Sequence, residues 1–402
     1  MKAHILFVAD GRSPTARSWI NQVQSLNYAT SLISTYPCRP LENLESFEIL
    51  PIAFSRFSRG TVPAETSRKK SKLKDLRSRL TPTLQFFRYR LGPLTIFLNK
   101  KKFRTLVGSI QPDLVHALRI PYEGMLASFT PRTIPLLVST WGNDLTLHAK
   151  KGWLMARLTH RCLTRADGLM SDTQRDARLA MDWGLRPKQP QLVTVGSGGL
   201  NLEAIQSAQG FSPGEYGIPV NAVWIVNPRG LRPGSVHQDV FFEAIPQVHQ
   251  KYPNTCFLCP NLQDVKQAQE WVQKFDLDRR TFLLPKLPQN QLWALFKQSK
   301  VFVSPSSHDG TPNALLEAMA CGCFPIVGDI ESMREWIEDG KNGFLVNPRN
   351  PEDLANAICN ALDQPLMLAE VAKKNRGIIK DRAAMRETLP TIDQFYAHFT
   401  QP

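Results

Sequence analysis

Short apolar runs alternate with helical stretches along this chain, and this alternation constrains the fold more than any other feature. The first half holds the runs HILFVAD, IPLLVSTW and QLVTVG, with helical patterns at 15–25, 151–164 and 173–183. The alternation restarts at about residue 222 and continues to 362. Buried parallel strands have such apolar runs, and each needs a crossover helix before the next strand. The sequence therefore predicts an α/β fold with two doubly wound, Rossmann-like domains.

The domain boundaries follow from where the alternation stops. The stretch GFSPGEYGIPVN at 210–221 has two prolines and three glycines and no periodicity, which is typical of a linker. We expect an N-terminal domain at 1–205 and a second domain at 206–380. The remaining segment, 381–402, is predicted to be helical and to pack back on the first domain.

Positive charge is concentrated in one segment. The chain has a formal net charge of +14, and the region 56–106 contains 15 Lys or Arg against two acidic residues, a local charge of +13. Leu73, Leu76 and Leu80 would share one face of a helix there. A basic segment with an apolar stripe fits an anionic membrane surface. We therefore expect a protein that contacts such a surface, and no nucleic-acid partner, because no recognition motif accompanies the charge.

The remaining composition narrows the class further. No apolar run approaches the ~18 residues of a membrane span, and MKAHILFVADG resembles a first buried strand more than a secretory signal. These features predict a cytoplasmic protein that can be peripheral on the inner face of the membrane. Cys256 and Cys259 are expected to be buried strand thiols, because no second pair supports a zinc site. Two arginines follow Asp276-Leu277-Asp278, so we interpret it as a loop and expect no metal and no cofactor.

The stretch 301–348 carries the clearest chemistry. An apolar strand, VFVSPS, leads into a polar loop and then a helix, with Asp309 before the helix and Glu317 inside it. A helix N-terminus presents unpaired N–H groups and favours anions. Thr311 is expected to cap the helix, with Pro312 as its first residue. The predicted anion-binding backbone lies at Gly310, Thr311, Pro312 and Asn313.

This stretch resembles the donor site of glycosyltransferase family 4, whose signature is Glu-x7-Glu followed by Ala-Met-Ala-x-Gly. The sequence has Asp309-x7-Glu317 and then Ala318-Met319-Ala320-Cys321-Gly322, followed by EDGKNGF at 338–344. The first strand and turn, ILFVADGRSPTARSWI, are also similar to the family. In this comparison the basic region around 56–106 lies outside the resemblance.

The resemblance implies a GT-B fold, with two Rossmann-like domains facing across a cleft, and a retaining, metal-independent hexosyl transfer from a nucleotide diphosphate sugar. Glu317 would bind the donor ribose, and Asp309, in place of the usual Glu, would hold the donor sugar. Arg229 or Arg232 would neutralise the diphosphate, although the Lys that the family places after them is absent.

On the N-terminal side the resemblance assigns less. The His that family members often carry is missing from STWGND, so Asp144 or Asn143 is the candidate to face the reacting sugar. Gly11 is expected either as a turn residue or as a point of close backbone approach to a substrate. His116 is interpreted as a satisfied histidine at a strand end.

The expected partners are the nucleotide-sugar donor and a glycan or lipid-linked acceptor, in cell-envelope polysaccharide or glycolipid synthesis. Two alternatives stay open from the sequence. One is a sugar-nucleotide epimerase of the same fold. The other is a basic nucleic-acid-binding protein that uses the +13 segment.

Overall fold

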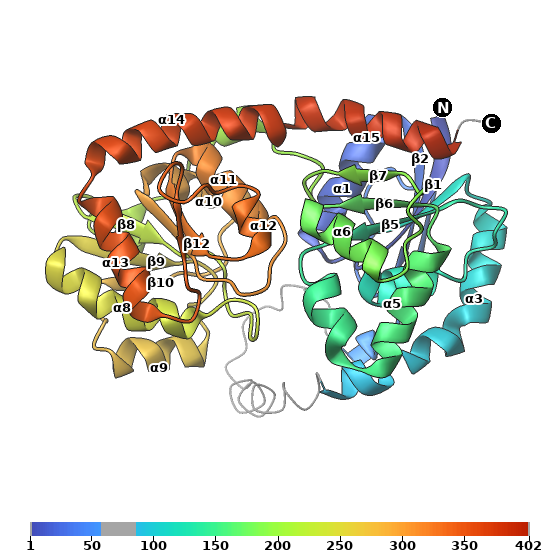
Figure 1. The fold of residues 1–402 in the computed structure, drawn as a ribbon, viewed down its shortest axis with the longest axis horizontal. Coiled ribbons are helices and arrows are strands. Elements are labelled where there is room, and N and C mark those ends of the chain that lie inside the picture. The colour runs from blue at the N-terminus through green and yellow to red at the C-terminus, as the bar shows by residue number, and fades with distance from the viewer. Residues whose placement is uncertain (1, 58–85, 401–402) are drawn as a thin grey trace. The chain divides into compact units, whose positions relative to one another are not determined.

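The computed structural model describes residues 2–57 and 86–400 of the chain (Figure 1). The chain divides into two compact units: unit 1 is Met1–Gly198 with Leu389–Pro402, and unit 2 is Gly199–Thr388. We predicted the change of domain at residue 205, and the structure has it after Gly198.

Unit 1 is built on a seven-stranded, wholly parallel sheet with the order β3-β2-β1-β4-β5-β6-β7. Its strands are β1 (Lys2–Ala9), β2 (Tyr28–Ser34), β3 (Ser46–Ile49), β4 (Leu114–Ala117), β5 (Leu136–Thr140), β6 (Gly168–Ser171) and β7 (Gln191–Val193). Its helices are α1 (Pro14–Ser25), α3 (Leu94–Ile110), α4 (Met125–Ala127), α5 (Trp153–Arg165), α6 (Gln174–Asp182) and most of α15 (Met385–Thr400). Short helical turns are η1 (Ser55–Phe57), η3 (Ile120–Gly124), η4 (Asp144–His148) and η5 (Ala149–Lys151).

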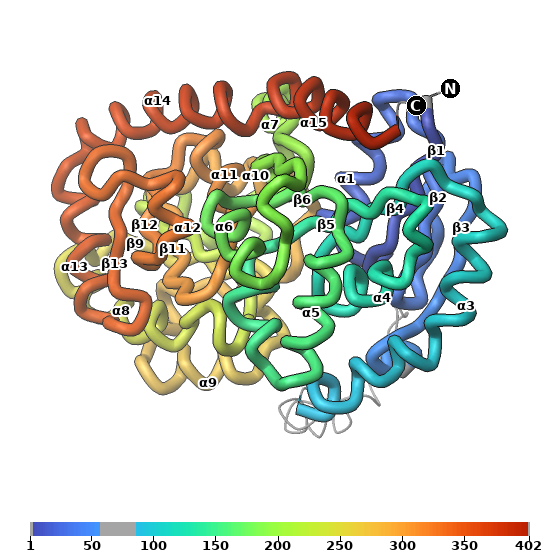
Figure 2. Tube along the Cα trace, turned by 45° about the vertical axis from the view of Figure 1, so that its right-hand side comes forward, coloured from blue at the N-terminus to red at the C-terminus, as the bar shows by residue number. Residues whose placement is uncertain are grey.

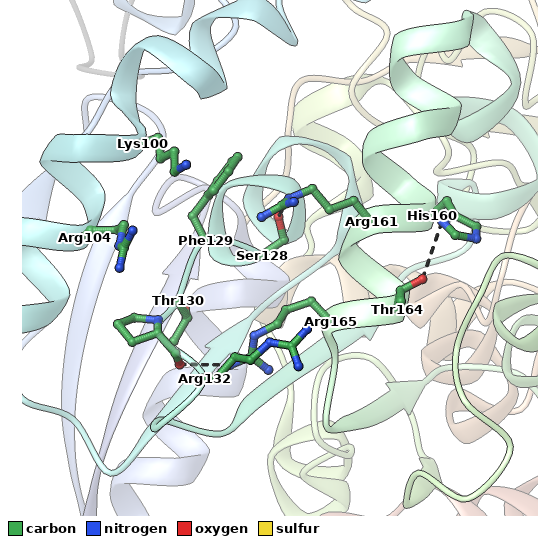
Figure 3. A pocket seen from close by; sticks show the side chains of 11 residues that line it. Lys100, Arg104, Ser128, Phe129, Thr130, Arg132, His160, Arg161, Thr164 and Arg165 are labelled. Atoms are coloured by element: carbon green, nitrogen blue, oxygen red, sulfur yellow. Dashed lines mark hydrogen bonds between the residues drawn. The ribbon is translucent and has the colours of Figure 1, made fainter.

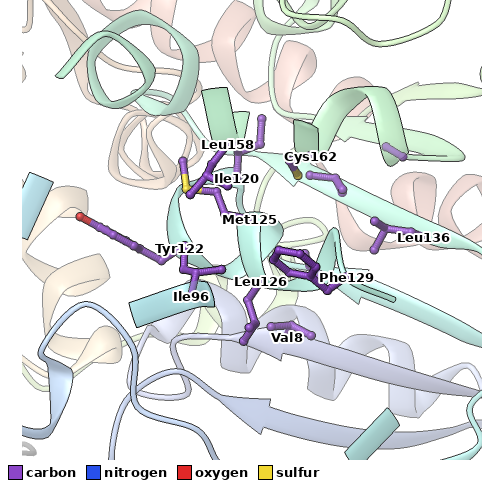
Figure 4. Close-up of a cluster of buried hydrophobic side chains, with 14 of the residues drawn as sticks. Val8, Ile96, Ile120, Tyr122, Met125, Leu126, Phe129, Leu136, Leu158 and Cys162 are labelled. Atoms are coloured by element: carbon purple, nitrogen blue, oxygen red, sulfur yellow. The ribbon is translucent and has the colours of Figure 1, made fainter. Parts of the chain in front are cut away.

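Strand β1 shows why this sheet needs helices on both faces. Leu6 and Val8 belong to a buried cluster with α3 and α5, part of which is drawn in Figure 4. Ile5 and Phe7, the residues between them, belong to a second cluster with α1 and α15. Because side chains alternate along a strand, an unbroken apolar run buries both faces of the sheet.

Helix α15 is part of the core of unit 1. Tyr396 is fully buried, and its hydroxyl accepts a hydrogen bond of 2.8 Å from the Trp19 indole N–H of α1. The Tyr28 hydroxyl donates to the Asp393 carboxylate at 2.9 Å. The last segment of the chain therefore closes one face of the first sheet.

Unit 2 has a six-stranded parallel sheet with the order β10-β9-β8-β11-β12-β13. Its strands are β8 (Val223–Val226), β9 (Thr255–Cys259), β10 (Thr281–Leu283), β11 (Val301–Ser304), β12 (Phe324–Gly328) and β13 (Phe344–Val346). Its helices are α7 (Leu202–Ser207), α8 (Gln238–Lys251), α9 (Lys266–Lys274), α10 (Gln289–Gln298), α11 (Asn313–Cys321), α12 (Glu331–Arg334), α13 (Pro351–Leu362) and α14 (Pro365–Arg382), with a short turn η6 (Pro213–Tyr216). Helix α13 packs beside α8, while α11 packs against α10 and α14; Figure 2 traces these helices along the chain.

One expectation about unit 2 is corrected by the structure. The predicted linker at 210–221 is wrong, because these residues lie inside unit 2, where Phe211 stacks on Tyr216 with ring centroids 5.7 Å apart.

Both sheets have the same kind of switch point. In unit 1 the strand order reverses between β1 and β4, and in unit 2 it reverses between β8 and β11. Chain segments that leave two such neighbouring strands diverge to opposite faces, which opens a crevice at the carboxyl ends of the strands. The functional residues should therefore follow these four strands.

Much of the basic segment lies outside the described residues. Residues 58–85, with the predicted Leu73, Leu76 and Leu80 stripe, lie outside the described residues. Its remaining part forms the helical residues 86–91 and the first half of α3. Within the described ranges, no helix combines the length and the apolarity that crossing a bilayer requires.

Candidate functional site

Two loops meet at the switch point of unit 2, one after β8 and one after β11. In the first loop, the Asn227 amide donates to the Gln238 side chain at 2.9 Å, and Gln238 donates to the Gly230 carbonyl at 2.9 Å. Asn227 and Gln238 are both fully buried. This internal network fixes the backbone of the loop that carries Arg229.

An ion pair between Arg229 and Asp309 joins the two loops. The two side chains are 5% and 13% exposed, so the pair is largely removed from water. The Nε–H of Arg229 is buried and has no hydrogen-bond partner among the described residues. A guanidinium with one donor engaged and another unused is suited to an anionic group beside the carboxylate.

The loop after β11 is anchored from several sides. The Ser235 hydroxyl donates to the His308 carbonyl, and His237 shares a 2.9 Å hydrogen bond with Ser307. The Ser332 hydroxyl donates to the Asp309 carbonyl at 2.8 Å. Residue 309 is therefore held at a fixed position by the first loop and by α12.

Helix α11 starts one residue later than predicted. Its first residue is Asn313, and Pro312 is the extended N-cap residue, without a side-chain capping bond. The predicted Thr311 cap is wrong, because Thr311 precedes the N-cap residue and its hydroxyl accepts the Trp336 indole N–H at 3.0 Å. The Gly310 N–H donates to the Asp309 carboxylate at 3.2 Å, so this amide is already engaged inside the loop.

Glu317 lies inside α11 and faces α10. Gln289 donates to its carboxylate at 3.0 Å. Burial raises the pKa of Glu317 to about 7, and the hydrogen bond from Gln289 opposes this shift. The group can therefore change its charge near neutral pH, although it is a glutamate.

Arg232, the second predicted phosphate ligand, is exposed in the same loop as Arg229. The loop thus offers one guanidinium inside the protein and one at its surface. The position where the family has a Lys is occupied here by Val236, which is buried, and His237, which bonds to Ser307.

In unit 1, Asp144 is fully buried. Its carboxylate accepts hydrogen bonds from Arg119 at 2.7 Å, from the Ile120 N–H at 3.0 Å and from the Trp141 N–H at 3.3 Å. These contacts connect the loops after β4 and β5. The arrangement gives Asp144 the part of a positioning residue rather than that of a group facing a sugar.

Gly11 follows β1, and protein atoms explain why it is a glycine. Its N–H donates to the Ser34 hydroxyl at 3.1 Å. A Cβ at this position would lie 2.5 Å from the Cys38 sulfur and 2.9 Å from Ser34 Oγ. The close backbone approach is therefore to β2 and the segment that follows it.

Two histidines and the strand cysteines have ordinary structural surroundings. His116 is fully buried between the Tyr396 hydroxyl at 2.7 Å and the Ser139 hydroxyl at 2.9 Å, which confirms the prediction of a satisfied histidine. Cys256 and Cys259 are buried in β9, as expected. Among the residues with described positions, no group of three or more His, Cys, Asp or Glu is arranged to hold a metal ion.

Sequence reasoning missed a cluster at the switch point of unit 1. Glu123 is buried in the turn after β4, where burial raises its pKa to about 7, and the Thr35 hydroxyl donates to it at 2.6 Å. The backbone is strained beside it, because Arg119 has φ of 132° and Tyr122 has φ of 68°. Such strain in non-glycine residues is typical of functional sites. The only sequence signal was their position, directly after a predicted strand.

Arginines surround this cluster. The Arg12 guanidinium lies 3.5 Å from the centre of the Tyr36 ring, and Arg88 lies 4.9 Å from that of Tyr122. Arg88 and Arg119 each have a buried Nε–H without a partner in the described part of the chain. Positive charge therefore gathers at the carboxyl edge of the first sheet.

Comparison with known proteins gives the class of this chain. The family described as Glycosyl transferases group 1 matches residues 233–378, and the family described as Glycosyl transferase 4-like domain matches residues 61–196. Together the two matches cover more than half of the chain. The chain belongs to the group 1 glycosyltransferases, that is, to glycosyltransferase family 4. Because the second match begins at residue 61, our expectation that the basic region lies outside the family resemblance is wrong.

Individual relatives are distant. A D-inositol 3-phosphate glycosyltransferase of Corynebacterium urealyticum is 23% identical over 172 residues, which are 39% of this chain and 41% of that protein. The chain thus spans less than half the length of this curated relative.

Solved structures share the fold. Sucrose-phosphate synthase from Thermosynechococcus elongatus aligns with a TM-score of 0.73 at 14% identity, over 99% of both chains. Anabaena HepE in complex with UDP-glucose aligns with a TM-score of 0.67 at 16% identity, over 98% of this chain and 100% of that one. With its two parallel Rossmann-like sheets, the chain has the α/β GT-B fold.

Proposed function

We propose that this protein transfers a hexose from a nucleotide diphosphate sugar to a glycan or lipid-linked acceptor, with retention of configuration and without a metal. The observation that carries this proposal is the Arg229–Asp309 pair, held at the switch point of unit 2 beside the start of α11. The donor class is supported by HepE, a structural neighbour whose structure was solved with UDP-glucose. The proposal places the reaction in cell-envelope polysaccharide or glycolipid synthesis.

The chemical demand of this reaction is stabilisation of negative charge on the departing nucleoside diphosphate. Arg229 supplies a fixed guanidinium whose Nε–H has no partner among the described residues. Arg232 supplies a second guanidinium on the exposed part of the loop. The start of α11 at Asn313 adds N–H groups that favour an anion. Asp309, fixed by Arg229, is placed to accept hydrogen bonds from hydroxyls of the donor sugar.

Glu317 is proposed to bind the donor ribose. A carboxylate can accept hydrogen bonds from two vicinal hydroxyls at once. Its partly buried place against α10 strengthens such bonds, because competing water is excluded.

The acceptor side is proposed to work at an anionic membrane surface on the cytoplasmic side. The described part of the basic segment exposes several large apolar side chains. They are Phe86, Phe87, Leu91, Leu94, Phe97 and Leu98, with exposed fractions between 44% and 81%. Arg90, Lys101 and Lys102 are exposed in the same stretch. Apolar and basic side chains together suit the headgroup region of a bilayer.

The donor site is tested by thermal shift with UDP, GDP, ADP and dTDP. One of these nucleotides should raise the melting temperature of the wild type, and Glu317→Gln should remove most of that rise. The matched control is Glu243→Gln, which changes an exposed glutamate on α8 of the same unit and should leave the rise intact.

The reaction is tested by product analysis with a nucleotide sugar, with and without a saccharide acceptor, in EDTA. Asp309→Asn should lower the transfer rate by about 100-fold, because Arg229 loses the partner that positions it and a small misplacement of a catalytic group has an effect of that order. Retention is read from the anomeric signal of the product. An isomerised donor in the absence of acceptor would instead support the epimerase alternative, and activity lost in EDTA would contradict metal independence.

A further inference from the structure

A basic pocket of about 380 Å³ lies in unit 1, away from the switch point. Its walls come from α3, from the loop 128–132 and from α5 (Figure 3). The loop leads into the start of β5, and α5 ends just before β6 begins. These segments therefore meet at the amino edge of the sheet of unit 1, opposite the carboxyl edge of the same sheet, where Glu123 and Asp144 lie.

The lining of this pocket is strongly cationic. Lys100, Arg104, Arg132 and Arg161 line it, and none of them has a carboxylate within ion-pair distance among the residues the structure describes. Figure 3 shows Lys100 and Arg104 entering from α3 and Arg161 from α5. Four uncompensated cations around one hollow repel one another, so an anion bound between them would be favoured.

The arrangement is partly preorganised. The Phe129 ring lies between two of the cations, with the Arg161 guanidinium 4.4 Å and the Lys100 ammonium 5.0 Å from its centre. The Arg161 Nε–H also donates to the Ser128 hydroxyl at 3.2 Å. Cation–π contacts and this hydrogen bond hold long side chains that would otherwise be disordered, which lowers the entropic cost of binding.

Two residues that line the pocket have buried polar atoms without a hydrogen-bond partner among the described residues. Thr130 is 4% exposed, and its hydroxyl has no hydrogen-bond partner in the described ranges. Arg165 donates to the Pro131 and Ile134 carbonyls at 3.0 and 2.9 Å, yet its Nε–H is buried and unpartnered in the same residue set. Leaving such groups buried without partners is costly, so the protein keeps an unfavourable arrangement beside this pocket.

We propose that this pocket is a second anion site, which binds the phosphate group of a small phosphorylated molecule or of a lipid headgroup. Phosphate offers several acceptor oxygens and more than one negative charge, which matches converging guanidinium groups. The exposed Phe97 of α3 packs edge-on against Phe129 with ring centroids 6.1 Å apart, so the apolar surface of α3 is continuous with the pocket wall. This continuity would allow a headgroup to enter while its lipid stays in a bilayer.

The test uses two matched double variants of the full-length protein. Arg104→Gln with Arg161→Gln removes two charges that line the pocket. Arg157→Gln with Lys188→Gln removes two exposed charges of the same unit that lie outside the pocket. Binding of inorganic pyrophosphate is measured by calorimetry at low salt. Any binding at the donor site is common to all proteins and cancels in the comparison.

The pocket variant should bind pyrophosphate at least tenfold more weakly at this second site, while the matched control binds like the wild type. Co-sedimentation with vesicles of phosphatidic acid and phosphatidylcholine then identifies the source. Weaker sedimentation of the pocket variant than of the control indicates a headgroup site, and equal sedimentation indicates a soluble phosphorylated ligand. The proposal is overturned if the pocket variant and the control bind pyrophosphate equally, or if saturating the donor site with its nucleotide removes all pyrophosphate binding of the wild type.

Discussion

The carboxyl edges of the two sheets have parallel chemistry but different architecture. Unit 2 has the Arg229–Asp309 ion pair, and unit 1 has the Arg119–Asp144 pair. In both pairs the arginine has a buried Nε–H without a partner among the described residues, and in unit 2 both side chains of the pair are largely buried. In unit 1 the aspartate is fully buried and also accepts two backbone N–H groups, while the arginine is 32% exposed. We propose that the first pair receives a ligand, whereas the second, whose carboxylate also accepts two backbone N–H groups, holds two loops together.

Each edge also has one glutamate whose pKa burial raises to about 7. Glu317 faces α10 inside a nine-residue helix, whereas Glu123 lies in a short turn with strained neighbours. A buried glutamate with a raised pKa can thus either bind a ligand or stabilise the conformation of a loop. Substitution at matched positions separates the two.

The largest expected effect is on stability, from Asp144→Asn. The amide keeps the shape of the carboxylate but leaves Arg119 without its counter-charge and weakens the acceptor for two N–H groups. Removing one partner of a buried pair costs about 3 kcal/mol. The melting temperature should therefore fall by about 6–12 °C, measured by calorimetry. Asp309→Asn should lower the melting temperature by much less, and equal losses would contradict the distinction between the two pairs.

The next effect is the pH dependence contributed by Glu123. Its pKa in the folded protein is about 7, above the ordinary value of 4.5. A raised pKa means that stability is fully present below about pH 4.5 and is lost as the pH rises through 7. Glu123→Gln cannot ionise, so it should be more stable than the wild type by about 3 kcal/mol at pH 8.5. The two proteins should melt alike near pH 4, and a difference independent of pH would contradict this assignment.

A smaller effect is expected for nucleotide binding at Glu317. The ionised carboxylate is the better acceptor for ribose hydroxyls, and its pKa of about 7 means that the ionised fraction falls between pH 8 and pH 6. Affinity for the preferred nucleotide should decrease by roughly tenfold over that range in the wild type. Glu317→Gln should bind the nucleotide weakly, and its affinity should lack this dependence on pH. If calorimetry gives parallel pH profiles for the two proteins, Glu317 does not bind the ribose.

The site at the carboxyl edge of the unit 2 sheet could be predicted from the sequence because its residues are close together along the chain. Asp309 and the helix that contains Glu317 follow one predicted strand, and the prediction of that helix missed only its first residue. Pro312 could be read as a first helical residue or as an N-cap. The Trp336 hydrogen bond that engages Thr311 comes from a residue 25 positions away, which no local pattern reveals.

The contacts at the carboxyl edge of the unit 1 sheet could not be predicted in the same way. Glu123 is bonded to Thr35, 88 positions away, and Asp144 to Arg119, 25 positions away. Such pairs exist only because β1, β2, β4 and β5 lie side by side in the parallel sheet. The sheet itself was predicted, because apolar runs report burial, but the order of its strands and the contacts between its loops depend on packing.

The smallest effect is expected for Gly322, a residue of the family motif whose role we expect to be structural. Gly322 ends α11 with φ of 94°, a conformation that costs other residues about 1 kcal/mol. An added Cβ would lie 2.4 Å from Nη2 of Arg376, a flexible side chain that can move. Gly322→Ala should therefore lower the melting temperature by about 2–4 °C, with nucleotide binding unchanged. Gly377→Ala is the matched control, because Gly377 lies inside α14 with open space around it and alanine favours a helix there by roughly 0.5–1 kcal/mol. Opposite signs for the same substitution would assign Gly322 to backbone geometry, whereas lost binding at unchanged stability would place the end of the motif in contact with the donor.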